Sequence, residues 1–214
     1  MPDPQVRDHR PHVMEELPRN GFVVIDDCDT KTAEELAASL GSARQWQTLV
    51  ARRAEDADPW SLSGVYGLGE FPWHTDGVVA TSPPRFLGFY CENAARDAAP
   101  TELLDLAASA QFSLTQRLAK LTLQVTDRSK RSRYLPALRR QGSTLAVRWD
   151  TRVAAPTDSL LGSEVIEALR CAPPTISIPW LSSRVLFIDN HRILHRRPAI
   201  RQPSARILKR IYVY

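Results

Sequence analysis

The hydrophobic pattern of this chain consists mostly of short apolar runs bounded by turn residues, a pattern typical of strands. Such runs predict strands at 21–27, 86–91, 121–125, 144–149, 175–178, 185–188 and 207–213. Helical spacing of apolar residues predicts helices at 31–40, 102–120 and 163–170. Because strands and helices do not alternate regularly, we expect a mainly β fold with flanking helices, a sandwich or a jelly roll, rather than a doubly wound α/β sheet.

The segments between these elements complete the outline of the chain. Residues 1–20 are polar and are expected to form an N-terminal arm, and residues 52–60 are expected to form a loop. The remaining part, 21–214, is long enough for one domain with a sizeable core. Neither the dinucleotide-binding glycine pattern nor the P-loop pattern occurs, so nucleotide-dependent chemistry of those two kinds is not expected.

Composition narrows the class of protein further. No apolar run approaches the roughly 18 residues that a membrane span requires, and the N-terminus lacks the apolar core of a secretory signal. The three cysteines are an odd number without a CxxC pair, which fits a reducing cytoplasm better than a disulfide framework or a zinc site. We therefore expect a cytoplasmic protein that is not embedded in a membrane.

The charge balance is mildly basic, with a net charge of +4 and a pI near 9.2. This excess is too small to indicate nucleic-acid binding by itself, and aromatic residues are not interleaved with the basic residues as in single-strand binders. Much of the excess lies in 128–140, which we interpret as a solvated basic loop. Contact with an acidic partner or substrate remains the alternative for this segment.

Two short motifs carry residues that bind metals. His74 and Asp76 are two positions apart, so extended backbone presents both side chains on one face. His195 lies just beyond the apolar run at 185–188 and would add a second imidazole. Two histidines and one carboxylate form the facial triad of non-haem iron sites. His191 is not expected to be the ligand, because the preceding β run and Pro198 leave little room for a helix that would place it beside His195.

The last predicted strand adds two arginines. Arg206 and Arg210 have the same parity in the run at 207–213, so a strand would place them on one face. An arginine that points inward from an apolar strand requires an anionic partner, for which a carboxylate is the natural choice. Solvated arginines on a surface strand are the alternative.

Taken together, these motifs resemble the taurine dioxygenase and clavaminate synthase-like (TauD/TfdA-like) superfamily of iron(II)- and 2-oxoglutarate-dependent oxygenases. The resemblance covers residues 21–214, with its specific motifs in 71–101 and 185–214. It implies a double-stranded β-helix of cupin-like, jelly-roll type, in which His74, Asp76 and His195 bind Fe(II). It further implies that Arg206 and Thr101 hold the co-substrate 2-oxoglutarate, and that Arg210 meets an anionic substrate.

Two positions depart from the family pattern. The Gly-Gly-x-Thr turn of the family is Ala98-Ala99-Pro100-Thr101 in this chain, and Arg196 replaces the glycine that usually follows the distal histidine. The chain is also short for the family, which leaves little room for a large lid.

The activity implied by the resemblance is oxidation of an unactivated C–H bond with O2, most often to an alcohol. The substrate would be a small, anionic or amino-acid-like metabolite, either free or presented by an acidic carrier protein that docks on 128–140. Candidate pocket residues are Tyr66, Glu70, Trp73, Arg148, Trp149 and Arg210. Glu70 and Arg210 would hold the two ends of an amino acid, whereas Trp73 and Trp149 have a core position as their alternative.

Two other classes of function remain open from the residues alone. One is a cupin-like metal-dependent isomerase or hydrolase that uses no 2-oxoglutarate; formation of succinate separates it from an oxygenase. The other is a nucleic-acid-directed oxygenase or a plain binding module, for which steeply salt-dependent affinity for single strands would be the sign.

Overall fold

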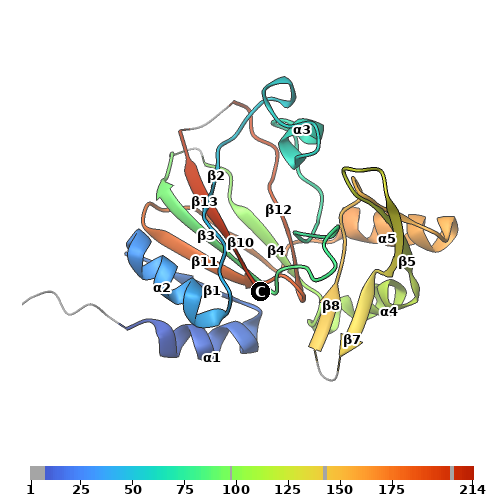
Figure 1. Ribbon diagram of the computed structural model, residues 1–214, viewed down its shortest axis with the longest axis horizontal. Helices are drawn as coiled ribbons and strands as arrows, with labels where there is room; N and C mark the ends of the chain where they lie inside the picture. Colours follow the sequence, from blue (N-terminus) through green and yellow to red (C-terminus); the bar gives the residue numbers. More distant parts are fainter. Residues whose placement is uncertain (1–7, 97, 142–143, 203–204) are drawn as a thin grey trace, which may run out of the picture.

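The computed structural model describes residues 8–96, 98–141, 144–202 and 205–214. Its largest sheet has five antiparallel strands in the order β1-β11-β3-β13-β2 (Figure 1). These strands are β1 (Phe22–Ile25), β2 (Gln47–Leu49), β3 (Phe86–Asn93), β11 (Arg184–Asp189) and β13 (Ile207–Val213). A smaller antiparallel sheet has the order β10-β4-β12. Its strands are β4 (Thr101–Asp105), β10 (Ile176–Ile178) and β12 (Ile193–Arg196).

The two sheets bury one apolar layer between them. In β3 the alternate residues Leu87, Phe89 and Cys91 face this layer, as period-two alternation requires. Side chains of both sheets share the cluster, including Leu186 of β11 and Leu103 of β4. Two antiparallel sheets packed in this way form the sandwich of a jelly roll, so the prediction of a mainly β fold with flanking helices is confirmed.

The outer face of the larger sheet is covered by two helices, α1 (Arg10–Asn20) and α2 (Thr30–Leu40) (Figure 1). Leu17 and Leu36 pack there against Phe187 of β11. The predicted helix at 31–40 is confirmed. The expectation of an arm is wrong for residues 10–20, because the polar majority of α1 hides two apolar positions one turn apart, Val13 and Leu17, that are buried.

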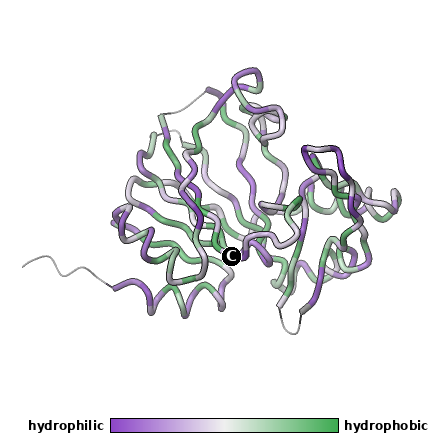
Figure 2. The backbone as a smooth tube through the Cα atoms, in the orientation of Figure 1, coloured by the Kyte–Doolittle hydropathy of each residue, from purple (hydrophilic) through white to green (hydrophobic). Residues whose placement is uncertain are grey.

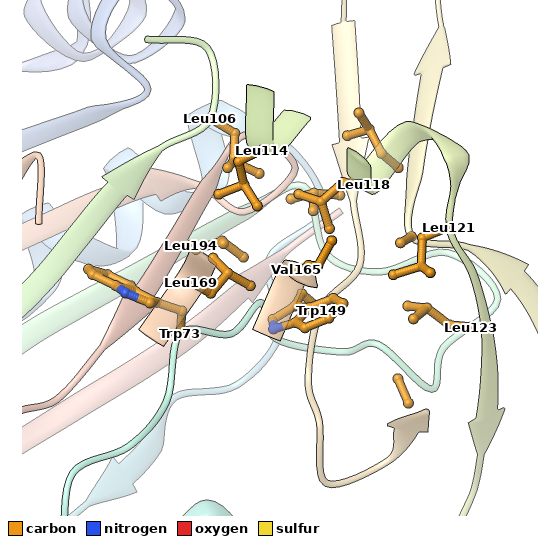
Figure 3. Close-up of a cluster of buried hydrophobic side chains, with 14 of the residues drawn as sticks. Trp73, Leu106, Leu114, Leu118, Leu121, Leu123, Trp149, Val165, Leu169 and Leu194 are labelled. Atoms are coloured by element: carbon orange, nitrogen blue, oxygen red, sulfur yellow. The ribbon is translucent and has the colours of Figure 1, made fainter. Parts of the chain in front are cut away.

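A side lobe packs on the outer face of the smaller sheet (Figure 1). It contains α4 (Phe112–Lys120), β5 (Thr122–Thr126), β6 (Ser132–Pro136), β7 (Leu138–Gln141), β8 (Thr144–Val147), β9 (Ala154–Pro156) and α5 (Ser159–Cys171). Its core joins leucines of α4 to Val165 and Leu169 of α5 and to Leu194 of β12 (Figure 3). The lobe is therefore anchored to the sandwich by side chains of the smaller sheet.

Two predictions inside this region are wrong. Residues 101–105 form strand β4 instead of the start of a helix, because Leu103 and Leu104 face different cores and both are buried. A strand that is buried on both faces has a continuous apolar run, which periodicity alone does not separate from a helix. The basic segment 128–140 contains β6 and β7 instead of a solvated loop. Figure 2 shows that its hydrophilic residues gather at the β5–β6 hairpin.

The connection between β2 and β3, residues 50–85, is long and contains the 3-10 turn Ala54–Asp56 and the small helix α3 (Leu62–Tyr66). A second 3-10 turn, Ser109–Gln111, lies between β4 and α4. The segment 52–60 is a loop apart from one of these turns, as predicted. Among the described residues, no helix has the length and apolar character needed to cross a bilayer.

Candidate metal and co-substrate site

His74 and His195 lie opposite each other although they are 121 residues apart in the sequence. Each donates its backbone N–H to the carbonyl of the other, at 3.1 and 3.0 Å, so the two residues form one antiparallel bridge. In such a pair both side chains project from the same face of the sheet. His195 belongs to β12, which pairs with β4 on its other edge. The sheet thereby fixes both imidazoles, with ring centroids 4.2 Å apart.

Asp76 is brought to the same place by a turn and by Asn190. The Asn190 side chain accepts from the backbone N–H of Asp76 at 2.9 Å and donates to its carbonyl at 3.0 Å. Gly77 follows with φ of 74°, and a Cβ at that position would lie 2.6 Å from Pro84. Only glycine adopts this turn without strain. The chain direction after Asp76 is therefore set by one buried amide and one glycine.

The three side chains form a cluster whose ligand atoms all lie within 4.8 Å of one another, and each is buried. Burial, together with the neighbouring His74, lowers the pKa of His195 to about 3. The Nδ1 of His74 lies 2.9 Å from the carbonyl of Pro72, a contact that favours a proton on Nδ1. The imidazole of His195 is therefore neutral at pH 7, the form that binds metals.

The electrostatics of Asp76 are dominated by two opposing effects. Burial raises the pKa of its carboxyl, whereas the charge of Arg210 lowers it, and the net result lies below the ordinary value. Arg210 donates to Asp76 Oδ2 at 2.9 Å and to Gln47 Oε1 at 2.8 Å. The carboxylate is thus ionised at neutral pH, and one guanidinium holds one of its oxygens.

This donor set fits a divalent first-row metal ion. Two imidazole nitrogens and one carboxylate are the ligands of the facial triad, which leaves coordination positions for other molecules. The buried Nδ1 of His195 has no hydrogen-bond partner among the described residues, although buried polar atoms are nearly always paired. A hydrogen-bond network that served only the fold would pair this nitrogen. The unpaired atom is therefore better explained if the cluster binds a ligand.

A cavity of about 500 Å³ opens directly over the cluster. Thr101, Arg206 and Arg210 line it together with the three clustered residues. Arg206 and Arg210 share the cavity with Leu208, so the predicted common face of these alternate positions is confirmed. The structure hence brings the predicted metal and co-substrate residues to one space.

Arg206 is buried without a carboxylate partner among the described side chains. Its Nη1 donates to the carbonyl of Ala99 at 2.6 Å, and burial lowers its pKa. Thr101 lies nearby on β4, where its hydroxyl accepts from Trp180 Nε1 at 3.2 Å. A buried guanidinium without a counter-ion is costly, so a carboxylate in the cavity is the group that this position lacks.

Other predicted pocket residues lie elsewhere. Trp149 is 2% exposed and belongs to the apolar core of the side lobe, together with Trp73 (Figure 3). Tyr66 stacks near Phe71, and Glu70 pairs with Arg196 at 2.8 Å on a half-exposed surface. None of these four is among the described residues that line the cavity. The pairing of Glu70 with Arg210 across a substrate is therefore not supported.

Two further candidate residues, Arg148 and His191, contact backbone carbonyls and lie outside the cluster. Arg148 donates to the carbonyls of Val78, Ala80 and Thr81, so it holds the loop after Gly77. His191 lies 3.4 Å from the Pro83 carbonyl and outside the cluster, as predicted.

Sequence reasoning missed three features of the site. Arg197 lines the cavity and is buried, with its guanidinium over the Phe71 ring and Nη2 bound to the carbonyls of Gly67 and Gly69. Asn190 was passed over although it follows the strand β11 directly. Trp60, Asp150 and Arg152 also line the cavity, and no local motif marks them.

Comparison with known proteins places the fold. No protein-family model matches the sequence, and no curated protein matches it. Solved structures do match. PvcB (PA2255) from Pseudomonas aeruginosa has a TM-score of 0.71 at 16% identity over 98% of this chain and 81% of that chain. The structure of asparagine oxygenase in complex with Fe(II), 2S,3S-3-hydroxyasparagine and succinate has a TM-score of 0.71 at 16% identity. The match covers 95% of this chain and 78% of that chain.

A third structure shares the same architecture. The non-heme iron oxygenase OrfP with Fe and alpha-ketoglutaric acid has a TM-score of 0.67 at 21% identity over 95% of this chain and 77% of that chain. At such identities the likeness concerns the fold, which is the cupin-like, double-stranded β-helix expected from the sequence.

Proposed function

We propose that this protein is an iron(II)- and 2-oxoglutarate-dependent oxygenase of the taurine dioxygenase and clavaminate synthase-like kind. The observation that carries the proposal is the buried cluster of His74, Asp76 and His195 in one cavity with Arg206, which has no carboxylate partner among the described side chains. Metal ligands and an anion site that share one cavity suit a metal-bound co-substrate with a distal carboxylate. The iron, 2-oxoglutarate and succinate present in structures of similar fold support the same cofactors.

Each residue then has a definite role. His74, Asp76 and His195 would hold Fe(II), and Arg206 with Thr101 would hold 2-oxoglutarate. When bound, iron and 2-oxoglutarate would activate O2, the oxidant, for attack on an unactivated C–H bond, with 2-oxoglutarate supplying two of the electrons as it is converted to succinate and CO2; the protein supplies orientation and exclusion of water. Asn190 keeps the Asp76 backbone in place, and Arg210 fixes the orientation of the Asp76 carboxylate.

The substrate of this reaction would be a small metabolite. OrfP has been solved with hydroxylated L-Arg and asparagine oxygenase with hydroxyasparagine, whereas PvcB belongs to an isonitrile synthetic pathway. These neighbours support a compact, anionic or amino-acid-like substrate. The six arginines of the cavity wall support the anionic character.

The proposal is tested by succinate formation. Protein with Fe(II), 2-oxoglutarate and O2 should release succinate slowly even without substrate. Asp76→Ala should abolish this release, because a facial triad without its carboxylate holds iron poorly. His191→Gln is the matched control and should retain it, since His191 lies outside the cluster. Release by Asp76→Ala at the normal rate would overturn the ligand assignment. Absence of succinate from the normal protein would favour the isomerase or hydrolase alternative.

Presentation of the substrate by an acidic carrier protein is a finer form of the proposal. Arg128 lines the cavity and belongs to the basic segment 128–140, so a carrier docked there would reach the opening. A salt-sensitive pull-down with an acidic acyl carrier protein tests this form; no binding at low salt would refute it. A cytoplasmic location is likewise proposed on the basis of three free cysteines, Cys28, Cys91 and Cys171.

A further inference from the structure

Charged side chains on the cavity wall are strongly one-sided. Within the described chain, the wall contains two carboxylates, those of Asp76 and Asp150. Against them stand six guanidinium groups, those of Arg128, Arg152, Arg196, Arg197, Arg206 and Arg210. Four of these bind carboxylates: Arg128 binds Asp58, Arg152 binds Asp150, Arg196 binds Glu70 and Glu102, and Arg210 binds Asp76. Among the described side chains, Arg197 and Arg206 have no carboxylate partner, so these two guanidinium groups make the cavity attractive to anions.

Both carboxylates already have cationic partners. Arg210 donates to Asp76, whose carboxylate is also a ligand in the proposed cluster. Arg152 binds Asp150 through Nε at 3.1 Å and Nη2 at 2.5 Å, and both side chains are nearly buried. Neither aspartate is therefore free to receive an ammonium group from a substrate. Glu70, the third candidate acid, binds Arg196 away from the cavity lining.

The outer part of the cavity is apolar. Val50, Trp60 and Val79 line it, and each remains more than a third exposed, at 37%, 39% and 37%. The Trp60 backbone is held in place, since its carbonyl accepts from Arg152 Nη1 at 2.5 Å. Exposed large apolar side chains around a cavity are a sign of a binding surface for an apolar ligand.

From these observations we infer that the substrate is a monocarboxylate with an aromatic or branched apolar body and no ammonium group. This inference rests on the proposed function, because it assumes that Arg206 is taken by 2-oxoglutarate. The carboxylate of the substrate binds Arg197, whose buried Nε has no hydrogen-bond partner among the described residues, and its apolar body covers Trp60, Val50 and Val79. An α-ammonium group would lie near the Arg197 and Arg206 guanidinium groups, with no unpaired carboxylate among the described lining residues, which is unfavourable.

Matched ligand pairs test the inference directly. The probes are 3-phenylpropanoate and L-phenylalanine, which differ by the ammonium group, and propanoate, which lacks the aromatic body. Binding is measured by calorimetry without O2, on protein loaded with redox-inert Mn(II) and 2-oxoglutarate. We expect 3-phenylpropanoate to bind at least about tenfold more tightly than either of the others, since one unpaired buried polar group accounts for a factor of this order.

Variants locate the binding. Trp60→Ala should weaken binding of 3-phenylpropanoate by about tenfold, and Trp60→Phe should restore most of it, because an aromatic contact contributes roughly that factor. The matched control is Phe112→Ala, an exposed aromatic residue of α4 in the side lobe, which should leave the affinity unchanged.

The outcomes separate this inference from the proposed function. If Mn(II) and 2-oxoglutarate do not bind, the proposed function itself fails. If both bind but L-phenylalanine or propanoate equals 3-phenylpropanoate, only the inference about the substrate is overturned. It is equally overturned if none of the three binds, or if Trp60→Ala and Phe112→Ala have the same effect.

Discussion

The β sandwich and the side lobe are both well packed, but they bury different kinds of side chain. Among the described residues of the side lobe, from α4 to α5, the buried side chains are hydrophobic, such as Leu118 and Val165, except for Asp150 in the β8–β9 connection. The sandwich and its rim instead bury charged and polar groups, including His195, Arg206 and Asn190. Burial of such groups opposes folding unless each has a partner. The comparison teaches that the core of the lobe serves stability, whereas the sandwich gives up stability to hold a site, to whose wall the lobe contributes Arg128, Asp150 and Arg152 from its loops.

The side lobe provides the largest expected effect on stability. Leu118 is fully buried in its core, so Leu118→Ala should lower the free energy of unfolding by about 2–5 kcal/mol. Urea denaturation measures the loss, and Leu160→Ala, at a residue 74% exposed, is the control. Succinate release per folded molecule should not change. A loss of release in the folded variant would show that the lobe takes part in the site.

In the sandwich, removing a buried charge should weaken ligand binding without lowering stability, the opposite of the effect expected in the lobe. Arg206→Met replaces a buried guanidinium by an apolar chain of similar length and should weaken 2-oxoglutarate binding by about 100-fold, as loss of one partner of a buried ion pair does. Thermal stability should stay the same or rise, because the unpaired buried charge is removed. The control is Arg201→Met, at an exposed position. Unchanged affinity for 2-oxoglutarate in Arg206→Met would contradict the assigned role.

Asn190 is expected to contribute to both metal affinity and stability. Asn190→Asp keeps the shape but removes the donor that binds the carbonyls of Asp76 and Pro84. Metal affinity should fall by about tenfold, a usual effect of losing a group that orients a ligand. Titration with Mn(II) measures it. If affinity is unchanged while stability falls, Asn190 serves only the fold.

The smallest effect concerns a surface pair on the sandwich. Arg184 binds Asp26 through two hydrogen bonds of 2.5 and 2.8 Å, which lower the pKa of the Asp26 carboxyl. The stabilisation is present above the ordinary value of about 3.9 and is lost as the pH falls through the lowered value. Asp26→Asn should therefore lower the free energy of unfolding by under about 1 kcal/mol at pH 7, and should have no effect at a pH below the lowered pKa of Asp26. Thermal melts at both pH values would show this; an equal loss at both would contradict it.

Much of the sandwich was predictable, because its strands alternate between two buried layers or end at turns. The strand 207–213 and the helix near 31–40 were found from periodicity alone. Strand β4 was not, since both of its faces are buried, and α1 was not, since two apolar positions carry its packing. Short strands such as β2 depend on pairing with β13, a contact between distant segments that no local pattern reveals.

The residues of the site also divide into those that local sequence patterns predict and those that only the fold brings together. The clustered residues and Arg206 lie in compact motifs whose spacing reflects a strand or a turn, so His74, Asp76, His195 and Arg206 could be predicted to share one site, with the roles that the family resemblance implies. The substrate wall is assembled from loops that only the fold brings together. This is why Trp60 and Arg152 were missed, and why Trp149, a core residue beside the site in sequence, was wrongly placed in the pocket.

The central claim is that one ferrous ion is held where His74, Asp76 and His195 converge. An anaerobic titration of the protein with Fe(II) in the presence of 2-oxoglutarate, followed by visible absorption, tests it most directly. The account predicts a weak charge-transfer band that saturates at one iron per chain, is absent in His195→Ala and persists in His191→Gln. A band that survives unchanged in His195→Ala, or one that never forms in the normal protein, would contradict it.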